Sequence, residues 1–134
     1  MKEPASGGVA VVGVVNCGHT GRLNHFVEQG AKAGALTIIC GGGSRRCWRQ
    51  VAPHGGARGM LPTNPWAIGL PGDEKGPVLI DFATSAMAGG WIMAALQAGA
   101  TLPHGVIIDK HGQSTIDPKA VVPKFFWYCT ILIR

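Results

Sequence analysis

The stretch V-A-P-H-G-G-A-R-G-M-L-P-T-N-P, residues 51–65, decides how the rest of the chain can fold. Proline fixes the backbone angle φ and lacks an N–H donor, while glycine adopts φ values that other residues avoid. We therefore predict an ordered loop here, with neither helix nor strand. Such a loop either shapes a functional site or wraps the edge of a core, and ordered loops carry function disproportionately often.

On the C-terminal side of this loop, the sequence predicts a β-hairpin. Residues 66–70 and 78–82 are short apolar segments, and Pro71–Gly76 between them is rich in turn formers. The two segments are therefore expected to pair in antiparallel orientation. Asp81, near the end of the second segment, either bonds nearby backbone amides or takes part in a site.

A helix is expected over residues 87–98, where Ala, Met, Leu and Trp occupy most faces. Apolarity all around a helix is typical of a buried or subunit-contacting position. Thr84 or Ser85 is expected to cap its start. Gly89-Gly90 weakens a helix, so we expect this pair to mark the close approach of another backbone.

The N-terminal sequence predicts a strand over residues 9–15 and a turn over residues 16–21. A helix over residues 22–32 and a second strand over residues 35–40 are expected to follow. This order most simply gives two parallel strands with a right-handed crossover. The turn N-C-G-H-T-G lacks the G-x-G-x-x-G of the Rossmann fold. Its His19 is either a hydrogen-bonded structural residue or a group that exchanges a proton near neutral pH.

The composition indicates one globular domain, because the 134 residues are 46% hydrophobic and only 14% charged. The net charge of +5 is scattered, without the basic stripe and interleaved aromatic residues of a nucleic-acid-binding surface. The apolar run 125–133 is too short to span a bilayer. Cysteines without C-x-x-C spacing and an N-terminus unlike a signal peptide predict reduced thiols and a cytoplasmic location. The five histidines form no paired ligand motif, so no metal site is predicted.

A few charged residues leave alternatives open. The cluster of Arg45, Arg46 and Arg49 is either a solvated loop or an anion site for a cofactor phosphate. Arg58 either holds a substrate carboxylate or forms a salt bridge within its loop. Asp109 lies beside a glycine-containing turn, so we interpret it first as a turn former and second as a site residue.

Several blocks together resemble a known family. They are V-A-P-H-G-G, L-P-T-N-P-W, G-P-V-L-I-D-F-A-T-S, A-G-G-W-I and L-P-H-G-V-I-I-D-K-H-G-Q-S-T-I-D-P, within a resemblance that covers roughly residues 7 to 118 in unbroken order. In this order they resemble the malate/L-lactate dehydrogenase family of nicotinamide-dependent 2-hydroxyacid oxidoreductases, and within it most closely the bacterial hydroxycarboxylate dehydrogenase B group. Several blocks matching at once are more specific than any single motif.

The resemblance implies an α/β fold, with a mixed β-sheet and packed helices, that binds nicotinamide differently from a Rossmann fold. It also implies an incomplete member of the family. Residues 1–118 would form part of a cofactor-binding and catalytic domain. The apolar residues 119–134 replace the glycine-rich continuation of the family and would form a divergent tail.

The resemblance also implies a site. N-C-G-H-T-G is similar to the family block that carries an active-site histidine, which makes His19 the candidate catalytic residue. The candidate cofactor-binding residues are His19, Thr20, Gly21, Thr63, Asn64, Pro65, Asp81, Phe82 and Ala83. The implied reaction interconverts a 2-hydroxyacid and its 2-oxoacid with NAD or NADP in a homodimer. The alternative is a catalytically inactive fragment that serves nucleotide binding or oligomerisation.

Overall fold

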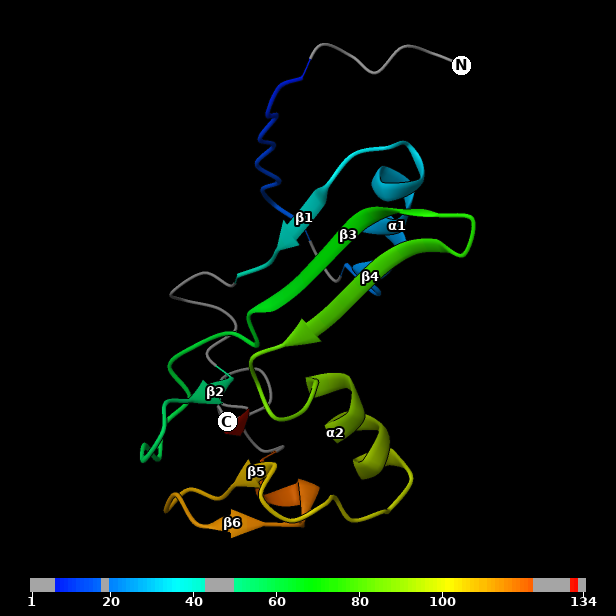
Figure 1. Cartoon of the computed structure of the whole chain (residues 1–134). Helices are drawn as coiled ribbons and strands as arrows, with labels where there is room; N and C mark the ends of the chain where they lie inside the picture. The colour runs from blue at the N-terminus through cyan, green and yellow to red at the C-terminus, as the bar shows by residue number, and fades with distance from the viewer. Residues whose placement is uncertain (1–6, 18–19, 43–49, 122–130, 133–134) are drawn as a thin grey trace. The chain divides into compact units, whose positions relative to one another are not determined.

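A computed structural model describes residues 7–17, 20–42, 50–121 and 131–132 (Figure 1). It contains helices and strands in an α/β arrangement, as predicted. The chain divides into two compact units. The first consists of residues 1–39 and 67–81, and the second of residues 40–66 and 82–134. Each unit is described by itself.

A three-stranded sheet dominates the first unit. Its strands are β1 (Thr37–Cys40), β3 (Pro65–Asp73) and β4 (Gly76–Ala83), in the order β1-β3-β4. Only Glu74 and Lys75 separate β3 from β4, so these neighbours form an antiparallel hairpin. The Asp73 carboxylate accepts a hydrogen bond from the Lys75 amide at 2.9 Å, and Gly76 adopts φ of 101°. The predicted hairpin is confirmed, with longer strands than expected.

Helix α1 (Asn24–Lys32) packs on one face of this sheet. Its spacing of apolar residues puts Leu23 and Val27 against Ala67 of β3, and these side chains are buried. Close approach requires a glycine at position 69, because a Cβ there would collide with the Val27 backbone. Gly34 follows the helix at φ of 84°, the left-handed conformation that commonly ends a helix.

The exposed side of α1 carries the pair Glu28 and Lys32, whose charged atoms lie 2.6 Å apart. This contact, one helical turn apart, lowers the pKa of the Glu28 carboxyl below its ordinary value, chiefly through the hydrogen bond from Lys32. Both side chains are solvated, so the pair adds little to stability.

The prediction of a buried strand at residues 9–15 is wrong for this structure. The segment is not in a strand, and its valines are exposed, Val9 by 94% and Val15 by 81%. A strand is stabilised by a neighbour that accepts and donates its backbone hydrogen bonds. No described strand pairs with this segment, so the predicted parallel pair with a right-handed crossover does not form.

The second unit has a core made of Val51, Ile92, Leu102, Ile107 and Val121. Helix α2 (Gly89–Gln97) contributes Ile92, which is fully buried. A short four-stranded sheet has the order β2-β7-β5-β6, with β2 (Val51–Ala52), β5 (Ile107–Ile108), β6 (Ser114–Thr115) and β7 (Ile131–Leu132). Strand β7 runs parallel to β2 and antiparallel to β5, and the 3₁₀ helix η1 (Pro118–Ala120) follows β6.

Residues 51–65 contain more regular structure than predicted. Val51 and Ala52 form β2, Val51 bridges Leu61 in antiparallel fashion, and Pro65 begins β3. The bridge uses backbone groups at both ends of the stretch, since the Leu61 amide donates to the Val51 carbonyl at 3.0 Å. The prolines and glycines between them keep the middle irregular, as expected. Tertiary pairing at its ends therefore overrides the prediction of a loop without strands.

Helix α2 begins later than predicted and without a side-chain cap. Its N-cap is Ala88 in an extended conformation, and Ser85 donates instead to the Met87 carbonyl at 3.1 Å. Open space surrounds the Cβ position of Gly90, so the expected close packing is wrong for this glycine. Nor is the helix buried on all sides, because Trp91 is 70% exposed. Within the described residues, no helix is long and apolar enough to cross a membrane.

Candidate functional site

Two of the predicted cofactor-binding segments lie at one end of the β3–β4 hairpin, within the second unit. Thr84 lies 21 residues after Thr63 and donates to its carbonyl oxygen through the backbone amide, at 3.2 Å, and through the hydroxyl, at 3.4 Å. The first segment, Thr63-Asn64-Pro65, leads into β3, and Phe82-Ala83 ends β4 directly before Thr84. These hydrogen bonds bring the two segments together.

Asn64 has an unusual backbone conformation, with φ of 47°. Residues other than glycine seldom adopt this left-handed region, although asparagine tolerates it better than most. Such conformations persist where the surrounding structure enforces them, and they concentrate at functional sites. On one side the Thr63 carbonyl is bonded to Thr84, and on the other the Pro65 carbonyl accepts the Gly41 amide at 3.0 Å. The turn at Asn64 is thus held from both sides.

Asp81 lies in the first unit and holds the start of α1. Its Oδ2 accepts a hydrogen bond from the Asn24 amide at 2.8 Å, across 57 residues of sequence. The N-cap residue Leu23 has no polar side chain, so this carboxylate satisfies an amide that the helix leaves free. The prediction that Asp81 bonds a backbone amide is confirmed, although the amide is distant in sequence. In the described residues its other oxygen, Oδ1, accepts no hydrogen bond.

Thr20 and Gly21 precede α1 and are both exposed, with Gly21 at φ of 68°. The structure therefore brings Thr20, Gly21 and Asp81 to the same helix end, in the first unit. His19 lies outside the described residues, so its catalytic and cofactor-binding roles stay predictions. The contact of Thr20, Gly21 and Asp81 with a cofactor also stays a prediction.

Asn24 is a residue that the sequence reasoning missed. Its side-chain Oδ1 is buried and accepts no hydrogen bond from the described residues, while its backbone amide is the one that Asp81 holds. Buried polar atoms usually have a partner, so an unpaired acceptor at this place is notable. No local sequence signal marks it, because its amide partner Asp81 lies 57 residues away in the sequence.

The charged residues for which the sequence left alternatives open have different outcomes in the structure. Arg58 is exposed and has no carboxylate partner among the described residues, so the salt-bridge alternative finds no support. Arg45, Arg46 and Arg49 lie outside the described residues. Asp109 is a turn former, as predicted, since its Oδ1 accepts the amides of His111 and Gln113 at 2.8 and 3.0 Å. Both hydrogen bonds lower the pKa of the Asp109 carboxyl, and the one from the Gln113 amide has the larger effect.

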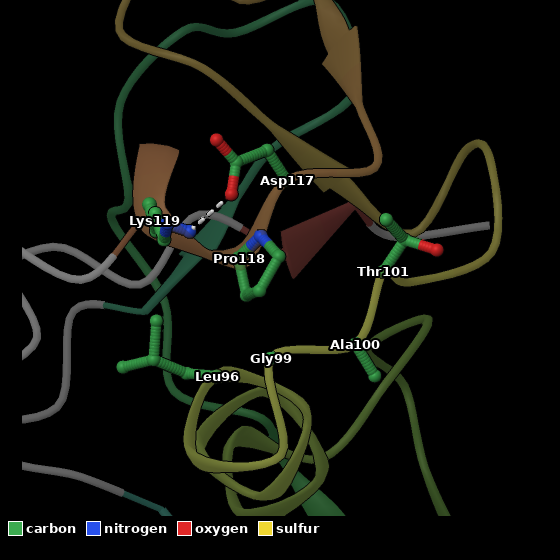
Figure 2. A pocket seen from close by; sticks show the side chains of 7 residues that line it. All are labelled: Leu96, Gly99, Ala100, Thr101, Asp117, Pro118 and Lys119. Atoms are coloured by element: carbon green, nitrogen blue, oxygen red, sulfur yellow. Dashed lines mark hydrogen bonds between the residues drawn. The ribbon is translucent and has the colours of Figure 1, made fainter.

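No three His, Cys, Asp or Glu side chains gather into a possible metal site in the part of the chain that the structure describes. Cys17 and Cys40 are exposed free thiols. A shallow hollow of about 280 Å³ lies in the second unit between the end of α2 and η1 (Figure 2). Its polar rim is engaged, since Asp117 accepts the Lys119 amide at 2.9 Å. None of the predicted site residues lines it.

Comparison with known proteins identifies the family. The sequence profile of malate/L-lactate dehydrogenase matches residues 1–131. The Δ1-pyrroline-2-carboxylate/Δ1-piperideine-2-carboxylate reductase of Pseudomonas putida is 40% identical over 91% of this chain and 35% of its own length. The ureidoglycolate dehydrogenase of Escherichia coli K12 is 36% identical, over 90% and 34%. Hydroxycarboxylate dehydrogenase B of the same strain is 35% identical, over 83% and 30%.

Comparison with solved structures leads to the same family. A dehydrogenase from Sinorhizobium meliloti superposes with a TM-score of 0.68 at 34% identity, covering 76% of this chain and 29% of its own. Malate dehydrogenase from Entamoeba histolytica gives 0.68 at 32% identity, covering 80% and 28%. The chain belongs to the malate/L-lactate dehydrogenase family and has its fold, so the predicted family and fold class are confirmed. It spans about a third of the length of the curated relatives.

Proposed function

We propose that this chain carries the nicotinamide-binding segments of an oxidoreductase that interconverts a 2-hydroxyacid and its 2-oxoacid with NAD or NADP. One observation carries the proposal. The Thr63–Thr84 hydrogen bonds hold together, at the same end of one hairpin, two segments that resemble the cofactor-binding blocks of the family. The names of the relatives, all dehydrogenases or reductases, support the same class of reaction.

The free acceptors near Asp81 suit such a cofactor. The ribose hydroxyls and the carboxamide of a nicotinamide nucleotide are hydrogen-bond donors. Within the described residues no donor bonds Oδ1 of Asp81, and the side-chain Oδ1 of Asn24 is buried without a partner. We propose that Oδ1 of Asp81, beside Thr20 and Gly21, accepts a hydrogen bond from a donor group of the cofactor.

The reaction needs three functions from the whole protein. When bound, a nicotinamide would supply the acceptor for the hydride at C2 of the hydroxyacid, and the chain would have to supply a base for the hydroxyl proton. We assign the base to His19. A cation must orient the substrate carboxylate, and the exposed, unpaired Arg58 is the candidate in the described part of the chain. The reverse reaction returns the hydride to C2 and the proton to the oxygen.

The substrate class follows from what the relatives' names share. A pyrroline carboxylate, ureidoglycolate and a hydroxycarboxylate all carry a carboxylate group. We propose a small carboxylate-bearing substrate of the 2-hydroxyacid or 2-oxoacid type. A homodimer and a cytoplasmic location are likewise proposals, the latter supported by the exposed free thiols of Cys17 and Cys40.

The test is a calorimetric titration of the purified chain with NAD⁺, NADH, NADP⁺ and NADPH. We expect saturable binding of one redox pair. Phe82→Ala should weaken it by roughly tenfold, the effect of one lost aromatic contact. Ile116→Ala is the matched control, since Ile116 is 45% exposed and Phe82 is 48% exposed in the same unit. A chain that is folded by circular dichroism and binds none of the four nucleotides would overturn the proposal.

The second candidate is a nucleotide-binding or oligomerisation fragment without turnover. The apolar surface that the first unit leaves exposed, Val9–Val15 included, favours this alternative. The two are separated by following NADH or NADPH consumption with a 2-oxoacid such as pyruvate. Turnover that His19→Ala abolishes supports the enzyme, whereas saturable cofactor binding without turnover supports the fragment.

A further inference from the structure

Thr84 lies next to the predicted cofactor-binding segments without being one of their residues. Its backbone amide and its partly buried hydroxyl both donate to the Thr63 carbonyl, at 3.2 and 3.4 Å. Phe82 and Ala83, directly before it, end β4, and Thr63 lies just before the start of β3. In Figure 1 the start of β3 and the end of β4 lie side by side. Thr84 therefore joins the two segments where the chain enters and leaves the hairpin.

The backbone at Asn64 is in a conformation that its neighbours must enforce. Its φ of 47° is left-handed, and the residue that follows is Pro65. A residue before proline prefers an extended conformation, because the proline ring contacts its backbone and Cβ. The conformation of Asn64 is thus disfavoured both by its own Cβ and by the next residue. Such a conformation persists where the surrounding structure over-determines it.

Gly41 holds the same turn from the other side. Its amide donates to the Pro65 carbonyl at 3.0 Å, and a Cβ at position 41 would lie 3.0 Å from Cγ of Pro65. Glycine therefore lets the chain come close enough to the proline ring for this hydrogen bond. All of these residues belong to the second unit. The turn at Asn64 is thus fixed by Thr84 on one side and by Gly41 on the other.

We propose that Thr84 is a positioning residue for the nicotinamide cofactor. By holding the Thr63 carbonyl, it keeps Asn64 in the left-handed conformation. It thereby fixes the loop 63–65 against Phe82-Ala83, and acts through this turn rather than by contact with the nucleotide. A loop that already has its bound geometry loses less conformational freedom when the ligand binds. The inference rests on the proposed function, because it takes these two segments as the ones that contact the nucleotide.

The test is a calorimetric titration with NADH or NADPH, whichever the wild type binds more tightly. Valine has the shape of threonine without its hydroxyl, so Thr84→Val should raise the Kd about two- to fivefold, the effect of one long neutral hydrogen bond. Thr84→Ser keeps the donor and should bind as tightly as the wild type. The matched control is Ser85→Ala, which removes the adjacent hydroxyl, a donor to the Met87 carbonyl at 3.1 Å. A folded Thr84→Val chain that binds as tightly as the wild type would overturn the inference.

A double-mutant comparison tests whether Thr84 acts through Asn64. Glycine enters the left-handed region without the cost that a Cβ imposes, so Asn64→Gly makes the turn less dependent on the hydroxyl. The rise in Kd caused by Thr84→Val should therefore be smaller in the Asn64→Gly chain than in the wild type. Any contact between the Asn64 side chain and the nucleotide is absent from both Asn64→Gly chains, so it cancels. Equal rises in Kd would contradict the positioning role.

Hydrogen exchange without nucleotide separates this inference from the proposed function. In Thr84→Val the Gly41 amide, on the other side of the turn, should exchange about two- to fivefold faster than in the wild type or Ser85→Ala. Faster exchange in a chain whose wild type binds neither nucleotide would refute the proposed function and the cofactor role of Thr84, but not its effect on the turn. Unchanged exchange at Gly41 would refute that effect. Thr84→Ala, which also lacks the hydroxyl, replaces Thr84→Val should the latter not fold.

Discussion

The contact between Asp81 and the first amide of α1 predicts a measurable loss of stability when the carboxylate is removed. In Asp81→Ala, the Asn24 amide loses its acceptor, which lies at 2.8 Å. Loss of an N-terminal cap costs about 1 kcal/mol, within a range of about 0.5–2 kcal/mol. Asp81→Asn keeps an acceptor oxygen and loses only the favourable charge at the helix end, which costs about 0.3–1 kcal/mol. The expected order of stability is wild type, then Asn, then Ala.

Urea unfolding followed by circular dichroism measures these differences, and the melting temperature should fall by about 3–5 °C for Asp81→Ala. Hydrogen exchange localises the effect, since the Asn24 amide should exchange about fivefold faster than in the wild type. Glu74→Ala is the matched control, because it removes one carboxylate from the turn between the same strands and breaks no described contact. An Asp81→Ala chain as stable as Glu74→Ala, with unchanged exchange at Asn24, would refute the reasoning.

Further predictions concern packing and pH. In urea unfolding, Gly69→Ala should destabilise the chain by about 1–3 kcal/mol, because the new Cβ would collide with the backbone of α1. Gly90→Ala should stabilise it by about 0.5–1 kcal/mol, because the Cβ position within α2 faces open space. Ile92→Ala should cost about 2–5 kcal/mol and Trp91→Ala less than about 0.5 kcal/mol, since the first side chain is fully buried and the second is 70% exposed; equal losses would contradict the assigned helix face. The pKa of Asp109 is lowered on folding, so the ionised carboxyl stabilises the folded state. This contribution to the free energy of unfolding should be complete above the unfolded pKa of about 3.9 and should disappear as the pH falls through the lower folded pKa. In a plot of the unfolding midpoint against pH, Asp109→Asn should therefore lose less stability at acid pH than the wild type does. An equal loss in both chains would contradict this.

Local chemistry made part of this fold predictable. The turn formers between residues 71 and 76 specified the hairpin of β3 and β4, and the apolar spacing over residues 22–32 specified α1. Asp109 beside its glycine predicted a turn that the structure confirms. In each case the groups that interact are within a few residues of one another, so the sequence alone contains the cause.

The failed predictions have a common origin. Residues 9–15 have the composition of a buried strand, yet a strand depends on a neighbour that composition does not name. Val51 became a strand residue because β2 pairs with β7 and Val51 also bridges Leu61. Helix α2 has the uncapped Ala88 as its N-cap, because Ser85 donates to the Met87 carbonyl instead. Long-range or competing hydrogen bonds decided each outcome.

The candidate site shows the same division. By itself the sequence determined the family and the segments to consider, because several blocks in one order carry that information without any coordinates. Only the tertiary structure showed that Asp81 caps a helix that begins 57 residues earlier, that Thr84 joins the two hairpin segments, and that the buried side-chain oxygen of Asn24 has no partner in the part of the chain that is described. These features arise where strand β4 meets distant parts of the chain, and a contact between distant residues leaves no local pattern from which it could be read.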